Sequence, residues 1–103
     1  MRFIVLALLI SCFSYGQDIT TVHFNYKWNQ NNTYKGLDKL RYSKVQYAFV
    51  EDQSDNIKKS IKSVPTIVIY NNNKPVAKFE AGLTMEITVR LDSIQAVVNK
   101  YKR

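Results

Sequence analysis

Val-His-Phe-Asn-Tyr-Lys-Trp-Asn-Gln-Asn-Asn occupies positions 22–32, and Val-Pro-Thr-Ile-Val-Ile-Tyr occupies positions 64–70. Apolar and polar residues alternate in the first stretch, which is typical of a half-buried strand, and we expect this strand to run from Ile19 to Trp28. Thr66 to Tyr70 contains β-forming residues without alternation, which predicts a strand buried on both faces. The two stretches therefore predict two strands, one half-buried and one buried on both faces.

Helices and strands are expected to alternate between these two stretches. Asn29 to Thr33 is a polar turn, and the apolar residues from Tyr34 to Leu40 recur at a spacing that predicts a helix, weakened by Gly36. Val45 to Val50 predicts a further strand. Ser54 is a suitable N-cap for a short helix after it.

The last third of the chain predicts a hairpin followed by a helix. Asn71 to Lys74 has the composition of a hairpin turn, because Asn tolerates positive φ, and Pro75 to Phe79 is the expected return strand. Gly82 ends this strand, and Thr84 is the expected cap of the final helix. Its apolar stripe consists of Ile87, Leu91, Ile94, Val98 and Tyr101. The order β-α-β-α-β-β-α predicts an α/β fold with a central mixed sheet flanked by helices.

Residues 1–16 have the pattern of a secretory signal peptide. Arg2 precedes an apolar run that is too short to span a membrane, and Ser14-Tyr15-Gly16 is a suitable cleavage site before Gln17. We therefore expect a single exported domain at residues 17–103, periplasmic or extracellular. Leu9-Ile10-Ser11-Cys12 also resembles the lipobox of bacterial lipoproteins, so lipidation of Cys12 and membrane anchoring stay open as an alternative.

Cysteine and charge limit the possible chemistry. Cys12 is the single cysteine of the chain, so cleavage after Gly16 leaves none. Without Arg2, 14 basic and 8 acidic residues remain, for a formal charge of +6. The basic residues are scattered along the sequence, which indicates solvated surfaces rather than a nucleic-acid site, although adhesion to acidic partners is a further hypothesis.

The two quoted stretches resemble the two halves of a thioredoxin active site, and the resemblance extends from about Ile19 to Tyr101. In that family a strand ends in Trp-Cys-x-x-Cys, and Val/Ile-Pro-Thr later opens a central strand. Here Trp28 and Val64-Pro65-Thr66 are present, but Asn29 and Asn32 replace the two cysteines. A carboxamide cannot form a thiolate or a mixed disulfide, so the chain is identified as a redox-inactive member of the thioredoxin-like superfamily.

Two further departures point the same way. His23 occupies the strand position where active thioredoxins usually have a buried Asp, and the segment between Asn32 and Val45 is shorter than the family's long second helix. A lone histidine among strand residues is more often hydrogen-bonded near the core than a ligand. No other metal-ligating residues lie at suitable spacing, so we expect neither a metal nor a cofactor.

The resemblance implies that Pro65 is a cis-proline beside the active-site turn and that Val64 presents its backbone to an extended segment. The expected peptide groove consists of Trp28, Asn29, Asn32, Val64 and Pro65. The first functional hypothesis is a monomeric, non-catalytic module that binds a protein or peptide. Alternatively, these residues only preserve the fold, or the protein takes part in thiol–disulfide exchange through a partner's cysteines.

Overall fold

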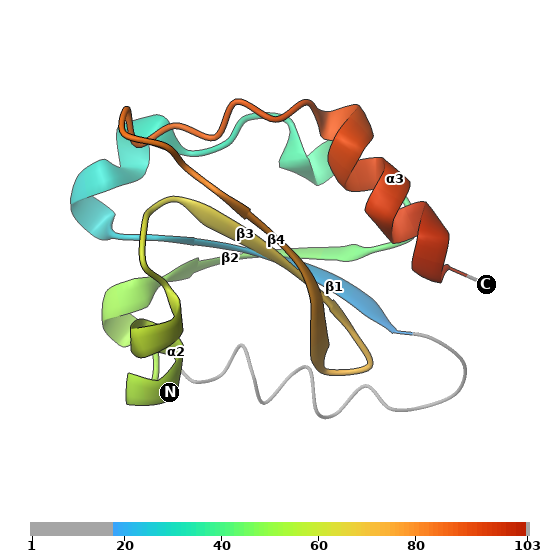
Figure 1. The fold of residues 1–103 in the computed structure, drawn as a ribbon, viewed down its shortest axis with the longest axis horizontal. Coiled ribbons are helices and arrows are strands. Elements are labelled where there is room, and N and C mark those ends of the chain that lie inside the picture. Colours follow the sequence, from blue (N-terminus) through green and yellow to red (C-terminus); the bar gives the residue numbers. More distant parts are fainter. Residues whose placement is uncertain (1–17, 103) are drawn as a thin grey trace.

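The computed structural model describes residues 18–102 and contains one four-stranded sheet (Figure 1). The strands are β1 (Ile19–Asn25), β2 (Lys44–Phe49), β3 (Thr66–Asn71) and β4 (Lys74–Glu80). Their spatial order is β2-β1-β3-β4, with β1 and β2 parallel and the other two pairs antiparallel. The expected α/β class with a mixed sheet is confirmed. The expected signal peptide, its cleavage site and Cys12 lie outside the described residues.

Helices cover both faces of this sheet. The short helix α2 (Asp55–Ser60) lies on one face and α3 (Leu91–Tyr101) on the other (Figure 1). Three 3₁₀ helices complete the elements: η1 (Lys27–Asn32), η2 (Leu37–Lys39) and η3 (Val50–Asp52). No helix within residues 18–102 is long and apolar enough to cross a membrane.

Alternation along β1 and β3 divides the core into two layers. Ile67 and Ile69 of β3 pack with Ile94 and Val98 of α3 on one face. On the other face, Val22 and Phe24 belong to a cluster that reaches α2. A one-residue slip of a strand would move its buried side chains to the opposite face of the sheet. The two core layers therefore favour a single register for each strand pair.

The helix expected over Tyr34 to Leu40 is wrong, because only the short 3₁₀ helix η2 forms there instead of an α-helix. Tyr34, Leu37 and Leu40 recur every three residues, which is the period of a 3₁₀ helix, and both leucines are buried in the core. Gly36 adopts a left-handed conformation with φ +89° immediately before η2. A side chain at this position would be strained, and the left-handed residue prevents a continuous α-helix.

The final helix begins at Leu91 rather than near Thr84. Residues 84–90 contain β-branched side chains that disfavour helix. Within this segment, Ile87 and Val89 still pack against the core below. The apolar stripe therefore marks burial correctly, but its first residue, Ile87, lies before the helix.

Two local predictions from the sequence are confirmed. The Ser54 hydroxyl accepts a hydrogen bond from the backbone N–H of Ile57 and caps α2. The β3–β4 hairpin turns through Asn72 and Asn73, at φ 56° and 73°. Successive positive φ values match the right-handed twist of the flanking strands.

Candidate functional site

Three asparagines hold together the turn that follows β1. Asn29 Nδ2 donates to Oδ1 of Asn25 at 3.1 Å, and Asn32 Nδ2 donates to Oδ1 of Asn29 at 2.8 Å. Asn25 Nδ2 donates in return to the backbone carbonyl of Asn29 at 2.9 Å. Asn25 and Asn29 are buried, so these bonds satisfy polar groups that water does not reach. We call this cluster the asparagine network.

Trp28 lies outside this network and points to solvent. Its side chain is 64% exposed, and its ring stacks on that of Tyr26 with centroids 6.1 Å apart. A large aromatic surface left in water costs free energy unless another surface covers it. Trp28 and Tyr26 therefore form a contact platform beside the turn.

The step before β3 is bent and largely buried. The Val64–Pro65 peptide bond is cis, and Pro65 is fully buried. The Pro65 carbonyl accepts a hydrogen bond from the backbone N–H of Ala81 at 3.1 Å, and Thr66 Oγ1 donates to the carbonyl of Ser63. Within residues 18–102, by contrast, the backbone N–H and C=O of Val64 make no hydrogen bond.

A groove of about 280 Å³ opens beside Val64, and we call it the Val64 groove. Its walls come from the residues after β1, the end of α2 and the loop after β4. The lining residues are Tyr26, Ile61, Lys62, Ser63, Val64, Gly82, Leu83 and Met85. Leu83 is fully exposed and Met85 is 41% exposed, so the groove has apolar side chains at its mouth.

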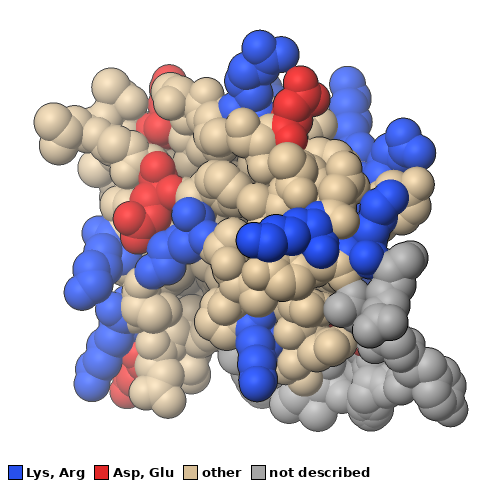
Figure 2. Space-filling model, turned by 45° about the vertical axis from the view of Figure 1, so that its right-hand side comes forward, with Lys and Arg blue, Asp and Glu red and all other residues tan. Residues whose placement is uncertain are grey.

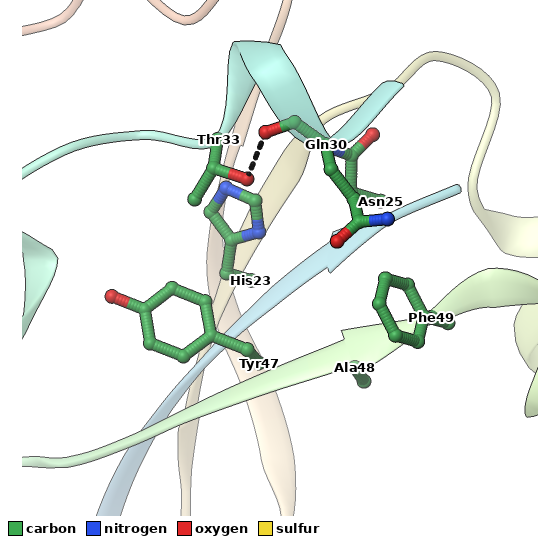
Figure 3. Close-up of a pocket in the computed structure, with 7 residues that line it drawn as sticks. All are labelled: His23, Asn25, Gln30, Thr33, Tyr47, Ala48 and Phe49. Atoms are coloured by element: carbon green, nitrogen blue, oxygen red, sulfur yellow. Dashed lines mark hydrogen bonds between the residues drawn. The ribbon is translucent and has the colours of Figure 1, made fainter. Parts of the chain in front are cut away.

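A second cavity, of about 210 Å³, lies over the β1–β2 part of the sheet. His23, Tyr47 and Phe49 face into it from the strands, and Gln30 and Thr33 close it from η1 and the residue after it (Figure 3). We call it the His23 cavity. Neither α2 nor α3 contributes a residue to its lining.

His23 is neutral and fixed. Its Nε2 accepts a hydrogen bond from the backbone N–H of Tyr34 at 3.0 Å, so the proton lies on Nδ1. Burial lowers the pKa of His23 below its usual value of 6.5, partly offset by a hydrogen bond to its own backbone. The expectation of a hydrogen-bonded core histidine is confirmed. No group of three metal-ligating side chains occurs within the described part of the chain.

The structure brings only some of the expected groove residues together. Val64 lines the Val64 groove. Trp28 is not among the lining residues, but its ring stacks on that of Tyr26, which is. Asn29 is buried in the turn, and Pro65 is buried just before β3. Asn32 lines a separate shallow depression with Lys35 and Glu86.

Sequence reasoning missed Leu83 and Met85 at the mouth of the Val64 groove. Both fall in the segment expected to cap and begin the last helix, where apolar residues were assigned to packing. Leu83 and Met85 stand outside the predicted apolar stripe, on either side of Thr84, and this was the available signal.

On the face drawn in Figure 2, basic side chains are spread rather than gathered. In the described part of the chain, ion pairs join Lys78 to Glu80 and Arg90 to Asp92, both near the surface. Such exposed pairs contribute little to stability. The dispersed pattern agrees with solvated surfaces.

No protein-family model and no curated protein matches the chain. Solved structures do match. A mutant thioredoxin from Halobacterium salinarum aligns with a TM-score of 0.63 at 15% identity, over 84% of this chain and 76% of that one. The fold is that of thioredoxin.

Other thioredoxin folds agree with this assignment. Thioredoxin-2, a component of the malaria parasite protein secretion machinery, aligns with a TM-score of 0.56 at 18% identity, over 84% of this chain and 86% of that one. The thioredoxin of Fasciola hepatica gives 0.55 at 14% identity, over 82% of each chain. The thioredoxin-like fold expected from the sequence is confirmed, and on this fold Asn29 and Asn32 stand in the turn after β1 where the resemblance places the two cysteines.

Proposed function

We propose that the protein acts after export as a non-catalytic module that binds an extended, apolar segment of another protein in the Val64 groove. The observation that carries this proposal is the combination of an unpaired backbone at Val64 with exposed apolar side chains around it. A backbone group that makes no hydrogen bond within the protein and borders a groove is available to pair with an extended peptide.

The chemistry of the groove favours an apolar peptide over a charged small molecule. Leu83 and Met85 offer exposed apolar contacts on one side, and Tyr26 offers an aromatic surface on the other. Lys62 supplies a cation at the rim. We therefore expect a segment whose alternate side chains are apolar, with an acidic residue tolerated near Lys62.

Thiol–disulfide exchange through a partner's cysteines, the alternative raised by the sequence, has no supporting contact. Asn29 is buried, and its Nδ2 and Oδ1 atoms are both hydrogen-bonded within the asparagine network. Residues 18–102 contain no thiol. We therefore place the proposed activity in the groove and not in the turn.

Selection of random peptides displayed on phage, followed by titration of a selected peptide, tests this proposal. We expect shifts of the Val64, Leu83 and Met85 amide resonances on titration. Leu83→Glu should weaken binding about tenfold or more, because it removes an apolar contact and adds a charge at the mouth. Tyr47→Glu, which adds the same charge on the other side of the turn, is the matched control and should leave the affinity unchanged.

Two results would count against the groove. One is the absence of any selected peptide whose binding depends on Leu83. The other is a peptide whose titration moves the resonances around His23 and leaves those of Val64 in place.

A further inference from the structure

Strand β2 forms one edge of the sheet and pairs only with β1 within the described residues. The carbonyl groups at its two ends accept hydrogen bonds from the side chains of Ser43 and Gln53. Among residues 18–102, the section between these ends, Val45–Ala48, has no second neighbouring strand. An edge of this kind can pair with another strand.

The two edges of the sheet differ in how they are protected. The opposite edge strand, β4, contains Pro75, three charged side chains and a bulge opposite Ile69 and Tyr70. All three features discourage pairing with another chain. Strand β2 has neither proline nor bulge, and its single charged residue, Lys44, stands at its start.

The surface beside the β2 edge is aromatic. Tyr47 is 51% exposed, and Phe49 is partly buried on the same face of the strand (Figure 3). Both rings border the His23 cavity, which is lined by no residue of α2 or α3. A strand added to this edge would bring its own side chains against these rings and remove apolar surface from water.

The charges at the two ends of β2 favour a second copy of this chain as the added strand. Arg41 precedes the strand, and Glu51 and Asp52 follow it. In an antiparallel pair of identical strands, the basic start of each copy meets the acidic end of the other, twice. The edge is thus complementary to itself, a property that a two-fold interface requires.

Symmetry also fixes which residues face each other. A two-fold axis perpendicular to the sheet keeps the same face of both copies on the same side. Residues that share the face of Tyr47 must then oppose one another. With the axis at Tyr47, this residue faces its own copy, and Val45 faces Phe49 of the second copy.

We propose that two copies of the chain pair antiparallel through β2, with Tyr47 at the two-fold axis, so that the two four-stranded sheets become one. This proposal departs from the sequence-based expectation of a monomer and does not depend on the proposed peptide binding. A short strand pair gives a small interface, and the net positive charge of both copies opposes association. The dimer should therefore form at micromolar to millimolar concentrations.

Sedimentation equilibrium of the purified protein over this concentration range measures the association. Hydrogen exchange at a low and a high concentration then locates it, with added protection expected for the Val45–Ala48 amides. Tyr47→Lys puts two ammonium groups opposite each other at the axis and should raise the dissociation constant about tenfold or more. Asp52→Lys places a positive charge near the basic start of the other copy, at both ends of the interface. It should therefore also raise the dissociation constant.

Leu83→Lys is the matched control, because it adds the same charge at a fully exposed position away from β2 and should leave the dimer intact. Circular dichroism of each variant establishes that it is folded, and Asp52→Lys changes an exposed side chain outside the core. A protein that stays monomeric throughout would overturn the proposal. So would a dimer that neither protects the β2 amides nor responds to Tyr47→Lys and Asp52→Lys.

Discussion

The Nδ2 atom of Asn32 donates a hydrogen bond to Oδ1 of Asn29, 2.8 Å away and three residues earlier in the turn. By the thioredoxin resemblance, these two positions hold the paired cysteines of the active enzymes. Here their side chains are joined by a hydrogen bond, and Asn29 continues the connection into β1 through Asn25. The two asparagines thus stabilise the turn by hydrogen bonds, and this structural role is enough to explain why they occupy these positions.

The asparagine network predicts an unequal pair of stability effects. Asn29→Ala should lower the free energy of unfolding by about 1–3 kcal/mol, because it removes a buried donor and a buried acceptor at once. Asn32→Ala should cost less, because Asn32 is only half-buried and makes the outer bond. Urea denaturation of both variants measures the difference, and an equal or larger loss for Asn32→Ala would contradict this account.

Stability should fall on mild acidification because of His23. Burial lowers the pKa of the folded imidazole below 6.5, so at lower pH the unfolded chain binds a proton that the folded chain does not. This stability is present above about pH 6.5 and is lost as the pH falls toward the folded pKa, with a slope of up to about 1.4 kcal/mol per pH unit.

Denaturant titrations at pH 7.5 and pH 5.5 test the assignment to His23. The His23→Gln variant keeps an acceptor near the backbone N–H of Tyr34 but cannot be protonated in this range. We expect its stability to change much less between the two pH values. If the stability of the variant depends on pH as strongly as that of the parent protein, another group is responsible for the loss at low pH.

Two glycines should respond unequally to the same substitution. Gly36→Ala should destabilise the fold by about 1–2 kcal/mol, because φ is +89° and a side chain is strained there. At Gly82, an added Cβ would meet no heavy atom within 4 Å, so Gly82→Ala should change stability by less than about 0.5 kcal/mol. Thermal unfolding of the two variants under identical conditions makes the comparison, and similar losses would argue against the left-handed turn before η2.

The proposed export predicts where the mature chain begins. We expect intact mass and N-terminal sequencing of the exported protein to give a chain that starts at Gln17 and carries no lipid. A lipid-modified start at Cys12 would instead attach the groove to a membrane surface. Retention of Met1 in the isolated protein would contradict both forms of export.

Local sequence signals predicted the sheet better than the helices. The β3 run and the Asn72–Asn73 turn are determined by nearby residues, so their positions follow from the sequence. The 3₁₀ helix η2 and the late start of α3 depend on how buried residues meet the sheet. Apolar spacing reports that burial but does not distinguish a helix from an extended segment packed on the core.

The candidate site was predictable only in part, for a related reason. Trp28 and Val64 stand in recognisable motifs, whereas Leu83 and Asn25 enter the site through contacts that the sequence pattern does not show. The role of Asn25 in particular is visible only when β1 and the following turn are in place, since its partner is four residues ahead across a bend.

The asparagine network has one further consequence. A carboxamide neither gains nor loses electrons under biological conditions and carries no proton that titrates near neutrality. The turn beside the Val64 groove therefore keeps one shape in oxidising and reducing surroundings alike. Its presentation of Trp28 is independent of the surrounding reduction potential.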